Sequence, residues 1–178
     1  MRVFLGFRPA AAILEEIGKL QQMFVKELPF ARPISLENLH ITLHFLGEIN
    51  HSQLESIREI GHKASQYSTL HQSIDQVIGL PTSQRARILA LSANTCQPTL
   101  RTLWLDFGKL LQDRGFHLDD RQFRPHITIA RMRMRAELTG LTRHAVSLQV
   151  PIQSITLFES HLNSKYAVLE EFPFLNTL

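Results

Sequence analysis

Apolar and polar residues alternate in several short stretches of the chain and repeat at three- and four-residue spacing in others. Alternation predicts strands, because successive side chains of a strand point to opposite faces, whereas helical spacing gives one apolar stripe. Apolar stripes predict helices after Pro9, after Asn50 or Ser52, and after Pro98, since proline and short polar residues favour helix N-termini. Strands are predicted at residues 3–7, 39–46, 74–79, 87–91, 126–130, 146–150, 152–158 and 166–172.

These elements predict an α+β fold. Each half of the chain contains a helix, a strand with one polar face and a hairpin in roughly the same order. No linker rich in proline, glycine or serine separates the halves. We therefore expect a single domain over residues 1–178, in which two antiparallel sheets with helices on their outer faces share a central cleft.

A tetrapeptide of His-Ile-Thr followed by an apolar residue occurs twice, at residues 40–43 and 126–129. In a strand, the histidine and threonine of each copy share one face and the two apolar residues share the other. One copy alone is a weak signal, since such a triplet arises by chance. Two copies with similar apolar flanks, one in each half of the chain, predict that both strands line the same cleft.

Two histidines and two threonines in one cleft suit displacement at phosphorus. Histidine titrates nearest neutrality, so two imidazoles can hold opposite protonation states and act as base and acid. The threonine hydroxyls can donate hydrogen bonds to the non-bridging oxygens of a phosphate. This scheme needs no metal and no cofactor. The single cysteine, Cys96, excludes an intrachain disulfide and a multi-cysteine zinc site, and fits a reducing compartment.

Basic residues surround the second motif. The formal net charge is only +3, but residues 121–135 contain five arginines and no acid, which predicts an anion site rather than a solvated charged face. Arg131 is a candidate for phosphate contact, because a guanidinium pairs well with phosphate oxygens. Its odd offset from His126 puts it on the opposite face unless the strand bends, so a surface role is equally open. Arg124, which precedes Pro125, is a weaker candidate for contact with the same anionic substrate.

His44 lies on the face of His40 and Thr42 if the first motif strand alternates regularly. We expect it at the edge of the cleft, where it can contact substrate. Joint metal binding by His40 and His44 is excluded, because four residues of a strand span about 13 Å.

Both motifs resemble the His-x-Thr-hydrophobic signature of the 2H phosphoesterase superfamily. The chain is more narrowly similar to the RNA 2′,3′-cyclic phosphodiesterases, historically called 2′-5′ RNA ligases. This narrower resemblance covers nearly the whole chain, through residues 2–4 with Pro9, 39–47, 124–131, and 157–160 with Tyr166.

The resemblance implies a bilobal, pseudo-symmetric fold and hydrolysis of RNA 2′,3′-cyclic phosphate ends to 2′-phosphomonoesters. It implies that His40 donates a proton to the leaving 3′ oxygen, that His126 accepts a proton from water, and that Thr42 and Thr128 hold the phosphate. Spacing alone does not decide which histidine is the acid. Reversal of the reaction would join a 5′-hydroxyl to a cyclic phosphate end.

Three alternatives remain open on the sequence. The same chemistry could act on a 2′-5′ oligonucleotide or a small nucleotide cyclic phosphate, the cleft could bind RNA without catalysis, or the protein could be a metal hydrolase. No apolar run reaches membrane-spanning length and the N-terminus opens directly into a strand. We therefore expect a cytoplasmic monomer without a membrane partner.

Overall fold

The computed structural model describes residues 1–175, and its secondary structure is as follows. The strands are β1 (Arg2–Phe7), β2 (Ala31–Pro33), β3 (Ile41–Glu48), β4 (Leu70–Ile74), β5 (Gln76–Leu80), β6 (Ala86–Ser92), β7 (His126–Ala136), β8 (Leu148–Ile152), β9 (Ser154–His161) and β10 (Lys165–Pro173). The helices are α1 (Ala11–Val25), α2 (His51–Gly61) and α3 (Pro98–Asp113). Short 3-10 helices lie at Leu36–Asn38, His62–Gln66, Ser83–Arg85, Leu141–Arg143 and Leu162–Ser164.

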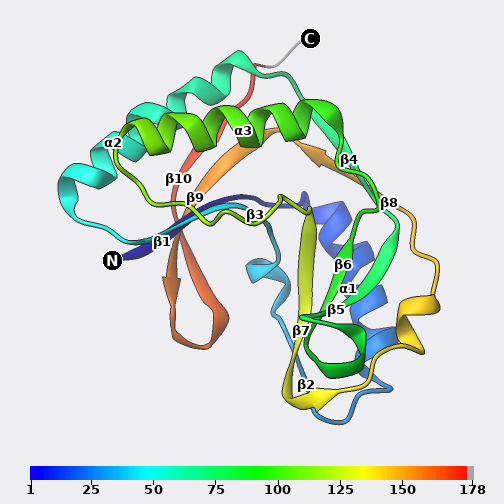
Figure 1. The fold of residues 1–178 in the computed structure, drawn as a ribbon. Helices are drawn as coiled ribbons and strands as arrows, with labels where there is room; N and C mark the ends of the chain where they lie inside the picture. Colours follow the sequence, from blue (N-terminus) through cyan, green and yellow to red (C-terminus); the bar gives the residue numbers. More distant parts are fainter. Residues whose placement is uncertain (176–178) are drawn as a thin grey trace.

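Over these residues, an eight-stranded antiparallel sheet runs in the order β10-β9-β1-β3-β7-β6-β5, with β2 beside β7. Its two halves are joined where β3 meets β7 at one residue pair, Ile41 opposite Ile127. Helices α2 and α3 cover the half that contains β1 and β3, and α1 packs against β2 and β7 of the other half (Figure 1). Strands β4 and β8 form a separate two-stranded sheet. The predicted α+β class with two antiparallel sheets and outer helices is confirmed.

The two halves of the sheet are the two lobes of the fold: β10, β9, β1 and β3 form the first, and β7, β6, β5 and β2 form the second. These lobes do not correspond to the two halves of the chain, which corrects the arrangement expected from the order of elements. The C-terminal hairpin of β9 and β10 joins the first lobe, since β9 pairs with β1 through Val3 and Glu159. Helix α1 follows β1 in sequence but packs on the second lobe. The pattern along the chain predicts which segments form strands, whereas pairing between strands far apart in sequence depends on tertiary packing.

Two helix ends show how the sequence sets the element boundaries. Asn50 begins α2 with a capping box: its Oδ1 accepts a hydrogen bond from Gln53 N at 2.9 Å, and Gln53 Oε1 accepts one from Asn50 N at 3.0 Å. Helix α3 ends at Asp113, and two residues later Gly115 turns the chain with a φ of 82°, which is costly for residues with a Cβ. Gly115 N donates to the carbonyl of Gln112, and Phe116 N donates to that of Leu111.

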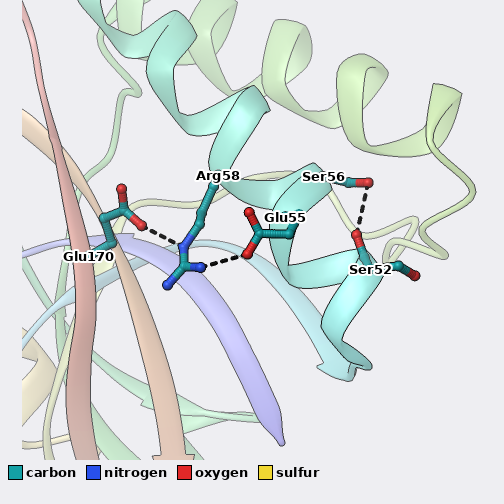
Figure 2. Close-up of polar contacts among 5 residues, drawn as sticks. All are labelled: Ser52, Glu55, Ser56, Arg58 and Glu170. Carbon is teal, nitrogen blue, oxygen red and sulfur yellow. Dashed lines mark hydrogen bonds and ion pairs between the residues drawn. The ribbon is translucent and has the colours of Figure 1, made fainter.

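Helix α2 is fixed on the first lobe by packing and by a partly buried ion pair. The side chains of Leu54, Ile57 and Ile60 are buried beneath it. Arg58 Nε donates to Glu170 Oε2 of β10 at 2.8 Å, and Arg58 Nη1 donates to Glu55 Oε1 at 2.7 Å (Figure 2). The apolar contacts supply most of the stabilisation, and the ion pair fixes the orientation of the helix.

Two local predictions are wrong. Strand β4 escaped the sequence pattern because its central buried residue is the polar Gln72, although its burial alternates as in a half-buried strand. Gly47 lies within β3 instead of ending it, with a φ of 73° at an irregularity in the pairing with β1. Among residues 1–175, no helix is both long and apolar enough to span a membrane.

Candidate active site

Both motifs line one cavity at the junction of the two lobes. The cavity has a volume of about 640 Å³ and receives His40 and Thr42 from the first lobe and His126 and Thr128 from the second. The sequence predicted this meeting from the repeat alone.

The pairing of β3 with β7 makes the site locally two-fold symmetric. Because the strands are antiparallel and meet at Ile41 and Ile127, the chain order sets His40 alongside Thr128 and Thr42 alongside His126. The two isoleucines are fully buried on the opposite face. The four polar side chains therefore point to the front of the sheet from both sides of a single crossing point.

Each histidine is oriented by the backbone two residues before it. His40 Nδ1 lies 2.8 Å from the carbonyl oxygen of Asn38, and His126 Nδ1 lies 2.8 Å from that of Arg124. A carbonyl oxygen accepts but cannot donate, so both rings carry a hydrogen on Nδ1. The Nε2 atom of each ring is consequently the one that exchanges a proton with a ligand.

An aromatic enclosure surrounds His40. Its ring centroid lies 4.7 Å from that of Phe4, 5.5 Å from Phe158 and 4.9 Å from the edge-on ring of Tyr166. Burial lowers the pKa of His40 to about 4; the nearby charges of His126 and Arg131 add to this effect, and the hydrogen bond to Asn38 opposes it. Without a bound anion, His40 is therefore neutral at neutral pH.

A bulge in β3 turns His44 away from the cavity. Thr42 and His44 pair with adjacent residues of β1, so Leu43 is an extra residue and the alternation shifts by one. His44 is buried against α3, where its Nε2 lies 2.9 Å from the carbonyl oxygen of Trp104 and its ring stacks on the indole. The prediction that His44 lies at the cleft edge is wrong, and Phe45 lines the cavity instead.

A bulge at the equivalent place in β7 brings Arg131 into the cavity. Thr128 and Ala130 pair with adjacent residues of β6, which leaves Ile129 extra. The strand thus bends in the way that a role for Arg131 at the site requires. Arg131 lines the cavity, and its Nε donates to Ser164 Oγ at 2.8 Å.

Gln21 of α1 holds the second bulge, and sequence reasoning missed it. Its buried Nε2 donates to the carbonyl oxygens of both Ile34 and Ile129 at 2.7 Å. Ile34 N also donates to Ile129 O at 2.9 Å. The signal was available: Gln21 is a polar residue within the apolar stripe of α1, between Ile17 and Phe24.

Replacing Gln21 with leucine is expected to lower the free energy of unfolding by about 1–3 kcal/mol, because a buried carbonyl loses a partner. Urea unfolding of the two proteins measures the difference. Gln22→Leu is the matched control at the exposed neighbouring position and is expected to change stability little. Equal losses in both variants would show that Gln21 has no special role at the bulge.

The two halves of the site differ at the fifth position after each histidine, where the first motif has Phe45 and the second has Arg131. Part of the cavity wall is apolar, formed by Phe45, Ile78, Leu80, Pro81 and Ile88. Arginines line the rest: Arg87, Arg121, Arg124 and Arg131. Arg124 also donates from Nη2 to Gln76 Oε1 at 3.1 Å. No carboxylate lines the cavity among the described residues, so the cavity favours an anion beside an apolar group.

Two further residues line the cavity, Asn38 and Tyr166, and neither was assigned a role in the site from the sequence. Asn38 is buried, and its Oδ1 accepts a hydrogen bond from the backbone N of Tyr166 at 3.0 Å. This contact ties the loop before the first motif to the start of β10.

Within residues 1–175, histidine, cysteine and carboxylate side chains do not gather in a group of three that suits a metal.

Comparison with known proteins gives consistent relatives. A family model described as LigT like Phosphoesterase matches residues 8–76. The RNA 2′,3′-cyclic phosphodiesterase of Methanocaldococcus jannaschii is 29% identical over 133 residues, which are 75% of this chain and 72% of that protein. The protein of the same name from Thermus thermophilus is 28% identical over 181 residues, covering 96% of this chain and 86% of that one.

Solved structures share the fold. TT0787 of Thermus thermophilus superposes with a TM-score of 0.85 and 21% identity over the whole of both chains. E. coli LigT in its apo form gives a TM-score of 0.78 and 22% identity over 98% of each chain. In this chain, two lobes each supply one histidine and one threonine to a shared cavity. The family match and these relatives support the 2H phosphoesterase family, which the two motifs resemble.

Proposed function

We propose that this enzyme hydrolyses 2′,3′-cyclic phosphate ends of RNA to 2′-phosphomonoesters. One observation carries the proposal: two imidazoles with Nε2 free of the backbone and two threonine side chains face one basic cavity. The relatives named RNA 2′,3′-cyclic phosphodiesterase support the choice of substrate.

In the proposed mechanism, a water molecule attacks phosphorus and passes a proton to Nε2 of His126. The bond between phosphorus and the 3′ oxygen breaks, and Nε2 of His40 supplies the proton that this oxygen takes up. Thr42, Thr128 and Arg131 donate hydrogen bonds to the non-bridging oxygens, where negative charge increases in the transition state. The assignment of acid and base follows the family resemblance, because the backbone contacts of the two rings are nearly symmetric.

His40 must be protonated to act as the acid, although its surroundings favour the neutral form. A bound phosphate opposes this effect, since a negative charge within a few ångströms favours the imidazolium. Substrate binding is thus expected to create the acid in the cavity. The aromatic enclosure then serves to exclude water and to strengthen the interaction between the imidazolium and the phosphate.

The titration of His40 tests this coupling. Without ligand, the imidazole is expected to titrate near pH 4 instead of near 6.5, and saturating 3′-AMP is expected to raise the midpoint. NMR of the imidazole carbons measures both, with the signal assigned by its absence in His40→Ala. Because the folded protein binds fewer protons than the unfolded chain between these pH values, stability also falls as the pH drops from 6.5 toward 4. A midpoint at 6.5 without ligand would contradict the effect expected of the enclosure.

The shape of the cavity favours a nucleotide. The apolar part of the wall suits a base, while Arg131 and the motif residues suit a phosphate. The related E. coli LigT has been solved in complex with 3′-AMP. The same groups permit ligation, in which a 5′-hydroxyl replaces water as the nucleophile, the bond between phosphorus and the 3′ oxygen breaks, and a 2′-5′ linkage forms.

Two substrates distinguish the proposal from its alternatives. In buffer containing EDTA, an oligoribonucleotide ending in a 2′,3′-cyclic phosphate is expected to be hydrolysed, whereas a 2′-5′-linked oligomer is expected to remain intact. Chromatography against synthetic 2′- and 3′-phosphate standards identifies the product. Cleavage of the 2′-5′ oligomer alone would overturn the substrate, and complete loss of activity in EDTA would overturn the metal-independent mechanism.

A further inference from the structure

A second groove opens beside the active-site cavity. It has a volume of about 950 Å³ and lies between β2, the end of β7 and the tip of the β9–β10 hairpin. Its lining shares Ile34, Asn38, Arg131 and Tyr166 with the cavity. The two hollows are therefore continuous, and a ligand can pass from one to the other along Arg131.

The charges of this groove are predominantly positive. Arg32, Arg131, Arg133 and Lys165 line it, against one carboxylate, Glu37. Within residues 1–175, none of these four cations takes part in an ion pair. Three other arginines, Arg58, Arg114 and Arg121, each have an acidic partner.

Two of these cations face each other directly. Arg32 on β2 is paired with Arg131 on β7 in the strand register. Like charges directly opposite each other destabilise a pair of strands. Arg133, two residues further along β7, lies on the same side of the strand by alternation, and all three are exposed. Repulsion between these like charges destabilises the protein without ligand. An anion that lies between the side chains reduces this repulsion.

We propose that this groove binds the phosphodiester backbone of the RNA nucleotides that precede the cyclic end. The inference rests on the proposed function and adds to it the class of substrate, an RNA strand of several nucleotides instead of a cyclic mononucleotide. The terminal base occupies the apolar part of the cavity wall and the cyclic phosphate lies at the motif residues. The strand then leaves along Arg131, where each further nucleotide presents one phosphate to Arg32, Arg133 or Lys165.

The rest of the cavity lining offers fewer unpaired cations than the groove. Ile78, Leu80, Pro81 and Ile88 present no donor side chain to a phosphate, and in the described part of the chain only Arg87 and Arg124 are cations there without an ion pair. Arg121 at the cavity rim is already paired with Asp119. The groove with unpaired cations is thus the path that neutralises most backbone charge.

The test compares the double variant Arg32→Ala/Arg133→Ala with the control double variant Arg135→Ala/Arg143→Ala. Both lose two positive charges from exposed positions, but the control residues line neither hollow. Each protein is assayed with a cyclic mononucleotide and with a hexaribonucleotide ending in a 2′,3′-cyclic phosphate. Fluorescence anisotropy measures binding of a labelled hexaribonucleotide ending in a 2′-phosphate at several salt concentrations.

The groove variant is expected to lose about 10-fold in kcat/KM for the hexaribonucleotide and to show a salt dependence of binding that is shallower by about 1 in the logarithmic slope. Its activity on the mononucleotide and both activities of the control are expected to match the wild type. Equal losses on both substrates, or equal losses in both variants, would overturn the proposal.

The same measurements separate the groove from the proposed function. If the wild type hydrolyses neither substrate but its RNA affinity depends on the groove, the proposed function fails and the groove proposal stands. If the wild type hydrolyses both substrates but its RNA affinity does not depend on the groove, the groove proposal fails and the proposed function stands.

Discussion

Alanine at His40 or His126 is expected to lower kcat on cyclic-phosphate RNA by about 10²–10⁴-fold, the usual contribution of a positioned general acid or base. The structure gives a reason for each loss. Each ring is held by a backbone carbonyl through Nδ1, so that Nε2 is available to the ligand, and alanine removes that atom without replacement. Steady-state kinetics on an oligoribonucleotide ending in a 2′,3′-cyclic phosphate measures both variants.

Two controls separate catalysis from folding and binding. His117→Ala removes an exposed histidine outside the cavity and is expected to retain full activity. Affinity for an RNA ending in a 2′-phosphate is expected to change much less than kcat in the two active-site variants. The double variant is expected to be little slower than the slower single one, because the two groups act in the same step. Unchanged turnover in either single variant would exclude the two-histidine mechanism.

Valine at Thr42 or Thr128 is expected to lower kcat by about 10²–10³-fold, as loss of one donor to a developing oxyanion typically does. Valine keeps the β-branched shape that suits the strand and removes only the hydroxyl. Because the antiparallel crossing at Ile41 and Ile127 places each threonine beside the histidine of the other motif, both losses are expected to be similar in size.

Serine and a distant threonine provide the comparison for these variants. Thr42→Ser and Thr128→Ser keep the hydroxyl and are expected to retain most of the activity. Thr102→Val removes a hydroxyl that donates to a helix carbonyl on the exposed face of α3, and is expected to leave turnover unchanged. If valine and serine reduce kcat equally, packing and not hydrogen bonding accounts for the effect.

The sequence predicted most of the site because the chemistry repeats. Two copies of one pattern, with alternating faces, were sufficient to place four side chains in one cleft. They also predicted that the apolar residues of each motif lie on the opposite face. The prediction could not extend past the fourth residue of either motif. A bulge at the fourth residue of each motif reverses the face on which the later residues lie, so His44 leaves the cavity and Arg131 enters it.

The remaining features depend on contacts between distant segments. The enclosure of His40 combines Phe4 from β1, Phe158 from β9 and Tyr166 from β10, none of which is close to the motif in sequence. Gln21 holds the second bulge from a helix that follows the first strand. Hydrophobic periodicity predicts each of these elements. It does not predict that α1 packs on the second lobe and that the C-terminal hairpin joins the first, and these long-range contacts bring the residues together.

The central claim is that two histidines act on one phosphate with different roles, and a substrate with sulfur in place of the 3′ bridging oxygen tests it most directly. A thiolate leaves without taking up a proton, so this substrate does not need the acid. His40→Ala is expected to hydrolyse it at nearly the wild-type rate, whereas His126→Ala, which lacks the base, is expected to remain slow. Recovery of His126→Ala instead would reverse the roles, and failure of both variants to recover would contradict acid–base catalysis by this pair.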